Sequence, residues 1–269
     1  NGSAVDTGAQ HTGIVARNAA CIGHIVGLFG FQHIVQGQVI QLDFVLAHGG
    51  IHAGRIGAVG SHAVILAHNA VTDLTVLGGL PNLVKLDISH NTVSSLSPIA
   101  LCSKLTNLNA ANNQISDASA ASSMPILAEL LLDHNQLSDI SGLSGCSNLT
   151  TLTISNNSIS DLSPLASLGN LQTLDFSYNQ VSEIPSFPGS SAMQLIDGSY
   201  NSIASIDVLA KMPNIRYIYM DYNKITDVDA LADCSLLVQL NVYGNEIASV
   251  SALTDHDIIV NYDPTNSED

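Results

Sequence analysis

Tyrosine and aspartate side chains gather in the C-terminal half of the chain, between residues 175 and 243. Tyrosine offers a large, rigid contact area with a polar tip and is enriched at binding hot spots, and carboxylates select cationic partners. These residue types predict recognition of a protein partner, with the aspartates favouring a partner that carries a basic patch. The predicted site, which we call the tyrosine–aspartate patch, comprises Tyr178, Tyr200, Tyr217, Tyr219, Tyr222, Tyr243, Asp175, Asp197 and Asp221.

A purely structural role is the alternative for these tyrosines. Tyr178, Tyr200 and Tyr222 are spaced 22 residues apart, so in a stack of repeats they would lie side by side and pair across strands. That role does not explain why six of the seven tyrosines in the chain are confined to this part of it. We therefore favour the binding interpretation.

Aspartates also recur at a fixed position in a way that suggests calcium binding. Each follows a recurring asparagine by four residues, and in three further repeats Ser95, Ser205 or Ser249 takes its place. One carboxylate per repeat, freely replaced by serine, is typical of a turn in which the side chain accepts a hydrogen bond from its own backbone. We assign this turn role, and no metal, to Asp73, Asp117, Asp139, Asp161 and Asp227.

Histidines offer two further candidates for metal binding. His48 and His52 are four residues apart, which would place both on one face of a helix, but two glycines lie between them and disfavour a helix. His68 and His90 are 22 residues apart and would be neighbours in a stack, where solvated side chains are the simpler interpretation. We predict no metal site and no cofactor. No nucleophile motif accompanies the many Ser, His and Asp residues, so we predict no enzyme activity.

The elements that would position these residues are set by an asparagine that returns every 22 residues. A fixed period between about 20 and 50 residues predicts a solenoid, in which stacked copies of one small unit bury a continuous core. The asparagine amide would bond backbone groups of the turn and of the next repeat, which makes its role structural. The nine positions are Asn69, Asn91, Asn113, Asn135, Asn157, Asn179, Asn201, Asn223 and Asn245.

Each repeat follows the pattern L-x-x-L-x-L-x-x-N-x-I-x-x-L-x-x-L-x-x-L. The portion before the asparagine alternates in hydrophobicity and predicts a short strand with one buried face. The apolar residues at every third position after it are typical of tight turns or 3₁₀ helix. Outward-facing strand positions six, four, two and one residues before the asparagine would form a concave face, and the tyrosine–aspartate patch falls on them.

This pattern resembles the leucine-rich repeat family, in particular the 22-residue form found in internalin-like bacterial surface proteins and in a eukaryotic phosphatase regulatory subunit. The stretches NLTTLTISNNSISDLSPLASLGNLQTLDFSYNQVSEI and NKITDVDALADCSLL carry the likeness. The resemblance implies an α/β-type solenoid, a horseshoe with a parallel concave β-sheet and a convex face of turns and 3₁₀ helix. It also implies a secreted or cell-surface bacterial protein that adheres to a protein partner.

Two other functions stay open under the same resemblance. The first is an intracellular regulatory subunit that docks on a partner enzyme, which would place the protein in the cytoplasm. The second is an accessory repeat region of a larger secreted hydrolase, with the chemistry in another part of that protein. Because the chain begins at Asn1 and not at methionine, we interpret it as a fragment or a mature product.

Charge narrows the choice of partner. The formal net charge is −16, and the repeats hold the whole excess, because residues 1–66 contain two arginines and two aspartates. An acidic solenoid disfavours nucleic acid and anionic membrane surfaces as partners. No stretch approaches the roughly 18 uninterrupted apolar residues of a transmembrane helix. We expect a monomer that binds a protein partner and does not insert into a membrane.

The first sixty residues do not follow the period. They contain no Lys, Glu, Pro, Tyr or Met, and the change in composition is abrupt near Ser61. They are either a degenerate N-terminal cap or a segment translated outside the true reading frame, and we favour the second interpretation. The predicted division is 1–60 as an atypical segment, 61–256 as a solenoid of about nine repeats, and 257–269 as a C-terminal cap and tail.

Small side chains interrupt the core positions of several repeats. Cysteines 102, 146 and 234 stand in a column otherwise filled by leucine and methionine, so we interpret them as buried thiols. Cys102 and Cys146 are two repeats apart, a separation of roughly 10 Å, which is beyond the Cα separation that a disulfide allows. At other core positions alanine or glycine replaces a larger residue, which predicts gaps in the core and weak interfaces between repeats. These positions are Ala110, Ala118, Ala121 and Gly198.

Overall fold

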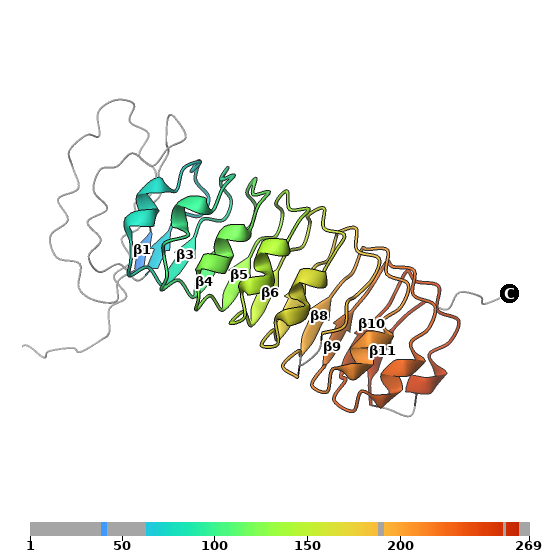
Figure 1. Cartoon of the computed structure of the whole chain (residues 1–269). Helices are drawn as coiled ribbons and strands as arrows, with labels where there is room; N and C mark the ends of the chain where they lie inside the picture. The colour runs from blue at the N-terminus through green and yellow to red at the C-terminus, as the bar shows by residue number, and fades with distance from the viewer. Residues whose placement is uncertain (1–38, 42–62, 188–190, 255–256, 264–269) are drawn as a thin grey trace, which may run out of the picture.

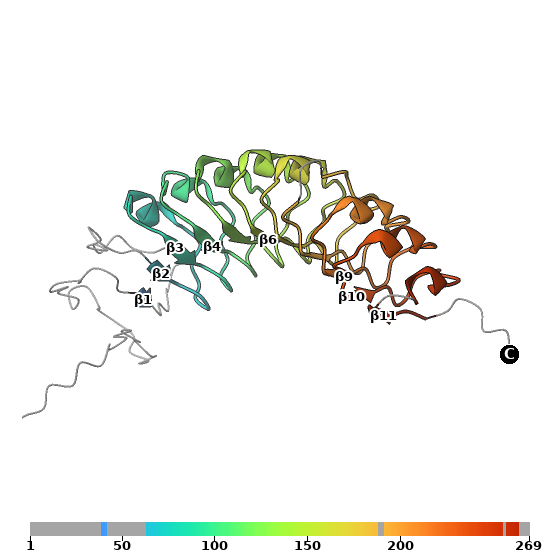
Figure 2. The same cartoon turned by 90° about the horizontal axis from the view of Figure 1, so that it is seen from below.

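The computed structural model describes residues 39–41, 63–187, 191–254 and 257–263. The repeats stack side by side into a curved array (Figure 1). Seen from below, the strands line the inner side of the curve and the helical turns lie on its outer side (Figure 2). This arrangement confirms the predicted solenoid with a parallel concave sheet and a 3₁₀ convex face.

The concave face is one parallel sheet whose strands follow in chain order from β1 to β11. Every strand is three residues long, with its middle residue buried wherever side-chain burial is described up to β10. Neighbouring strands pair 22 residues apart, except for offsets of 24 at Val39↔Ala63 and 20 at Gln239↔Ile259. The strands are β1 (Val39–Gln41), β2 (Ala63–Ile65), β3 (Lys85–Asp87), β4 (Asn107–Asn109), β5 (Glu129–Leu131), β6 (Thr151–Thr153), β7 (Thr173–Asp175), β8 (Leu195–Asp197), β9 (Tyr217–Tyr219), β10 (Gln239–Asn241) and β11 (Ile259–Asn261).

The convex face carries eight short 3₁₀ helices among the described residues. In the repeats that have aspartate four residues after the asparagine, its carboxylate accepts the backbone N–H two residues later, at 2.8 Å for Asp73 and 2.7 Å for Asp139. Ser95 accepts the equivalent bond at 3.2 Å, so the predicted turn role is confirmed. The helices are η1 (Thr75–Gly79), η2 (Ser97–Ile99), η3 (Ser119–Ser123), η4 (Ser141–Gly145), η5 (Ser163–Ser167), η6 (Asp207–Lys211), η7 (Asp229–Asp233) and η8 (Ser251–Leu253).

The asparagine column holds each repeat to the one before it. The side-chain amide of Asn113 donates to the carbonyl oxygens of Ile88, Ala110 and Ala111 at 2.9, 3.1 and 3.2 Å, and its Oδ1 accepts the N–H of Val93 at 2.9 Å. The prediction of a structural role is confirmed, but the expectation that the amide bonds to the next repeat was wrong. Ile88 and Val93 belong to the preceding repeat, because the amide lies where its own turn meets that repeat.

One apolar core runs through all the described repeats. Cys102, Cys146 and Cys234 are buried and unpaired in it, as predicted. Burial raises the pKa of the Cys146 thiol to about 11, so this thiol stays protonated near neutral pH. These cysteines act as small apolar side chains and not as nucleophiles.

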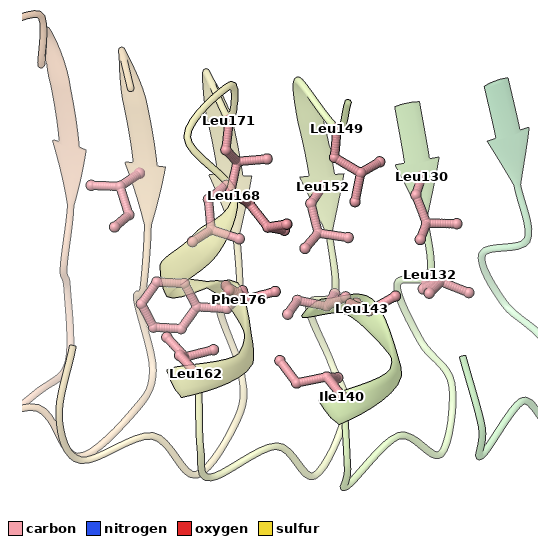
Figure 3. Close-up of a cluster of buried hydrophobic side chains, with 14 of the residues drawn as sticks. Leu130, Leu132, Ile140, Leu143, Leu149, Leu152, Leu162, Leu168, Leu171 and Phe176 are labelled. Atoms are coloured by element: carbon pink, nitrogen blue, oxygen red, sulfur yellow. The ribbon is translucent and has the colours of Figure 1, made fainter. Parts of the chain in front are cut away.

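The gap predicted at Gly198 is absent. A Cβ atom on this glycine would lie 2.5 Å from Cζ of Phe176 and 2.8 Å from Sδ of Met220. Figure 3 shows the Phe176 side chain reaching toward the neighbouring repeat, and the ring is fully buried. The prediction was wrong here because a large side chain in the preceding repeat fills the space that the glycine leaves. The weak interface predicted at Ala110, Ala118 and Ala121 stays a prediction.

The sheet extends past both predicted ends of the solenoid. Strand β1 lies within residues 1–60 and pairs with β2, and β11 lies within residues 257–269 and pairs with β10. The other residues of 1–60, with His48 and His52 among them, lie outside the described part of the chain. The domain boundaries and the origin of residues 1–60 therefore stay predictions.

Candidate functional site

Four members of the tyrosine–aspartate patch stand on strands. Asp175 pairs in register with Asp197, and Asp197 pairs with Tyr219, so the three side chains form one row across β7, β8 and β9. Tyr217 stands in the parallel row, opposite Leu195 on β8 and Gln239 on β10. All four patch residues are partly exposed while the residues between them are buried, so they face the concave side.

The other five members do not lie on strands, which corrects the sequence interpretation. Each strand ends four residues before the asparagine, so Asp221 and Tyr243 follow the strand and the remaining three tyrosines lie in the turn. Those three have left-handed backbone angles, with φ of 54° at Tyr178, 57° at Tyr200 and 52° at Tyr222. The expected strand position was wrong because the turn begins two residues earlier than the alternation suggested.

The left-handed position explains histidine and asparagine in this column but not tyrosine. Asn112, Asn156 and His134 occupy it with φ of 57°, 52° and 52°. Short polar side chains that can bond locally tolerate this region best, and Asn, Asp and His are enriched in it several-fold. The backbone therefore gives no reason for the change to tyrosine from residue 178 onward.

The three turn tyrosines form a continuous stack, which we call the tyrosine ladder (Tyr178, Tyr200 and Tyr222). Ring centroids are 4.2 Å apart for the first pair and 4.5 Å for the second, with interplanar angles of 10° and 20°. The ring stacking expected from a purely structural role of these tyrosines is therefore present. The three tyrosines are still 48%, 40% and 45% exposed, so a large part of each residue remains accessible to solvent.

The hydroxyls of the ladder lie close enough to affect one another. Hydrogen bonding with Tyr178, followed by desolvation and the neighbouring phenols, raises the pKa of Tyr200 to about 12. The Tyr200 hydroxyl is therefore neutral near physiological pH and is available as a hydrogen-bond donor and acceptor.

The ladder ends at Gly244. This residue has φ of 69°, and a Cβ atom on it would lie 2.6 Å from Cδ1 of Tyr222. The ring of Tyr222 thus lies against the glycine, and Tyr243 meets it edge-on at a centroid distance of 5.6 Å. Tyr243 is 49% exposed, so the aromatic surface continues around this end of the ladder.

The aspartates of the patch are fixed by backbone hydrogen bonds. Oδ1 of Asp175 accepts the N–H of Ser177 at 2.9 Å, and Oδ1 of Asp197 accepts the N–H of Ser199 at 3.0 Å. Oδ1 of Asp221 accepts the N–H of Tyr243 at 2.8 Å. These bonds fix the position of each carboxylate.

The carboxylates lie near one another on a partly desolvated face. Burial raises the pKa of Asp175, and the charges of Asp197 and Asp133 raise it further, while the hydrogen bonds from Ser177 lower it. Burial also raises the pKa of Asp221, and the charges of Asp197 and Asp263 add to this increase, while the hydrogen bond from the backbone of Tyr243 lowers the pKa. The concave face therefore concentrates negative charge.

Asp263 lies beside the tyrosine–aspartate patch and was not found from the sequence. Its Oδ1 accepts the N–H of Gly244 at 2.8 Å, which places it beside the end of the tyrosine ladder. The 22-residue period did not find it because β11 pairs with β10 at an offset of 20. The hydrophobic alternation of Ile258, Val260 and Tyr262 was the signal that could have revealed the shorter last repeat.

The histidine candidates form a stack and not a metal site. The rings of His68 and His90 are 4.1 Å apart with an interplanar angle of 12°. Ring nitrogens bind metals in the ring plane, so parallel stacked rings do not direct two lone pairs at one ion. Within the described ranges, no group of three or more His, Cys, Asp or Glu side chains is placed to hold a metal. No helix in the described part of the chain could span a membrane.

Family models for leucine-rich repeats match the chain in three places. The model described as "Leucine Rich repeats (2 copies)" matches residues 127–167 and 147–189, and the "Leucine Rich Repeat" model matches residues 82–103. The search of curated proteins found no significant match to this chain.

Solved structures of other leucine-rich repeat proteins are similar over most of the solenoid. Internalin C2 from Listeria monocytogenes is 27% identical, with a TM-score of 0.58 over 74% of this chain and 79% of that one. A leucine-rich repeat protein from Leptospira interrogans is 18% identical, with a TM-score of 0.60 over 74% and 60%. A plant peptide hormone receptor in complex with RGF2 is 23% identical, with a TM-score of 0.66 over 75% and 35%. Together with the 22-residue period and the single parallel sheet, these matches show that the chain has a leucine-rich repeat fold similar to that of internalin C2.

Proposed function

We propose that this domain is a non-enzymatic protein-recognition module whose contact surface is centred on the tyrosine–aspartate patch. The observation that carries the proposal is the half-exposed tyrosine ladder, which occupies left-handed positions that asparagine and histidine fill elsewhere in the chain. Exposed tyrosines above rigid backbone give contact area at low entropic cost. The open concave sheet is the surface that solenoids commonly use for binding.

The internalin-like resemblance supports a secreted or cell-surface location and an adhesive role for the protein. The plant receptor solved in complex with RGF2 is an example of a leucine-rich repeat protein with a bound partner, although its similarity to this chain concerns the fold. We expect the contacts to centre on Tyr200, Tyr219 and Tyr222. These residues belong to two neighbouring repeats, those that contain β8 and β9, and so lie within the size of a binding hot spot.

Replacing Tyr219 and Tyr222 by asparagine is expected to weaken partner binding by about 2 kcal/mol per tyrosine, or roughly 30-fold in Kd each. Both substitutions install residues that the chain already has at the same repeat positions, namely Asn241 and Asn112, so the fold is expected to persist. The measurement is recovery of partners from the organism's natural surroundings, followed by titration of each recovered protein with wild type and variant.

The matched control is His68→Asn with His90→Asn, which makes the same kind of change in the same turn column at the other end of the array. The control is expected to bind with wild-type affinity. Equal recovery and equal affinity for wild type and the Tyr219/Tyr222 variant would show that the patch is not the binding site.

A further inference from the structure

Building on the proposed function, we infer that the partner presents an extended basic segment that lies along the axis of the solenoid. It crosses β7 to β11 over the concave face, and its Lys or Arg side chains contact the carboxylates between the exposed tyrosines. The surface is a sheet face with no partner. Its negative charge, the spacing of its repeats and its exposed aromatic residues together favour an extended basic segment as the ligand.

The charge of the face calls for a cationic partner. Asp175, Asp197, Asp221 and Asp263 come from four of the five repeats that contain β7 to β11. Among the described residues, no lysine or arginine forms an ion pair with Asp175, Asp197 or Asp221. Like charges crowd together instead, which contributes to the raised pKa of Asp175 and of Asp221. A basic segment would relieve this repulsion, and an acidic segment would add to it.

The carboxylates are also pre-positioned for a second bond. The backbone N–H groups of Ser199 and Tyr243 occupy Oδ1 of Asp197 and of Asp221. No residue in the described ranges bonds Oδ2 of either aspartate. A carboxylate with one oxygen fixed and one available can accept a charge-assisted bond without first being ordered.

The direction of the segment follows from the shape of the sheet. Each strand has three residues, so a segment parallel to a strand would meet the carboxylate of a single repeat. A segment across the strands meets one repeat about every 4.8 Å, and the distance from β7 to β11 is about 19 Å. An extended chain of roughly six residues covers that length, with alternate side chains about 6.6 Å apart on one face. Long Lys and Arg side chains bridge the remaining difference.

The exposed tyrosines fit the same occupant. Tyr219 stands in the row of Asp197, and Tyr243 is bonded through its backbone to Asp221. A cation held by a carboxylate beside an aromatic ring gains a further attraction to the ring face. Leu195 and Ile259 stand in the row of Tyr217 and offer apolar contact to side chains between the basic ones.

The test uses three synthetic ten-residue peptides and the whole chain. The first peptide alternates Lys and Thr, the second replaces every Lys by Glu, and the third has the composition of the first with its lysines in one block. We expect the alternating Lys peptide to bind more tightly than either of the others, and its affinity to fall as salt rises. Equal binding of the Lys and Glu peptides, or of the alternating and block peptides, would overturn the inference.

The variants separate a local effect from net charge. Asp197→Asn with Asp221→Asn is expected to weaken the alternating Lys peptide about tenfold and to flatten its salt dependence. The control, Asp117→Asn with Asp161→Asn, removes two charges from the turns that start η3 and η5 and is expected to change the affinity less than about twofold. Equal weakening by both pairs would mean that overall charge, and not this surface, attracts the peptide.

The same variants distinguish this inference from the proposed function. If the natural partner is lost by the Tyr219/Tyr222 variant but bound normally by the Asp197/Asp221 variant, the surface is correct and the basic segment is wrong. If neither variant weakens the natural partner, the proposed function itself fails.

Discussion

Replacing Gly198 by isoleucine is expected to lower the free energy of unfolding by about 3 kcal/mol. The first added carbon would lie 2.5 Å from Cζ of Phe176 and 2.8 Å from Cε2 of the same ring, in a part of the core where Phe176 is fully buried. The ring has to leave the space that it occupies in wild type. Urea unfolding followed by circular dichroism measures the loss.

The double variant Phe176→Leu with Gly198→Ile tests the cause of that loss. It restores the ordinary core column, in which Ile154 and Leu132 precede these positions. We expect the two changes together to cost less than the sum of the single changes by at least about 1 kcal/mol, because each relieves the defect of the other. Gly79→Ala is the control, since a Cβ atom at Gly79 would have no other atom within 4 Å. Additive single effects would contradict the proposed filling of Gly198 by Phe176.

Replacing Asn113 by alanine is expected to cost about 3 kcal/mol of unfolding free energy. The side chain makes four hydrogen bonds in a buried position, and its loss would leave the N–H of Val93 and the carbonyl of Ile88 without these partners. Each unpaired buried backbone group costs about 1–3 kcal/mol, partly recovered when the turn relaxes or water enters.

Asn148→Ala is the matched control for this prediction. Asn148 makes one hydrogen bond, to the carbonyl oxygen of Pro125, and that bond is exposed. We expect this change to cost no more than about 0.5 kcal/mol in the same urea experiment. Losses of similar size for both asparagines would mean that the recurring asparagine does not stabilise the stack through its buried bonds.

The sequence predicts the repeated parts of this fold well because the same pattern of polar and apolar residues recurs in each repeat. Nine asparagines in one register, with apolar residues at fixed distances, constrain the buried face of the strand, the existence of the turn and the stacking of neighbouring repeats. Single residues that depend on one neighbour are harder to predict. Gly198 resembles a defect until the ring of Phe176 is placed beside it, and that contact joins residues 22 positions apart.

The tyrosine–aspartate patch was predicted on outward-facing strand positions of the concave face, but only four of its nine residues lie on strands. The period brought Tyr178, Tyr200 and Tyr222 side by side, and the structure confirms that their rings stack. Their left-handed backbone was not predictable, because tyrosine is uncommon in that region and the alternation gives no sign of where the strand ends. Asp263 was missed for a similar reason, since the last strand departs from the period.

Hydroxyl-radical footprinting of the complex with a recovered partner would locate the contact surface on this domain. Radicals modify exposed tyrosine rings, and Tyr200, Tyr222 and Tyr243 are 40%, 45% and 49% exposed in the free domain. We predict that partner binding strongly reduces modification of these three tyrosines and of Tyr219, while Leu101, which is 79% exposed and follows η2, reacts as before. Protection of Leu101 with unchanged modification of the tyrosines would show that the partner binds away from the tyrosine–aspartate patch.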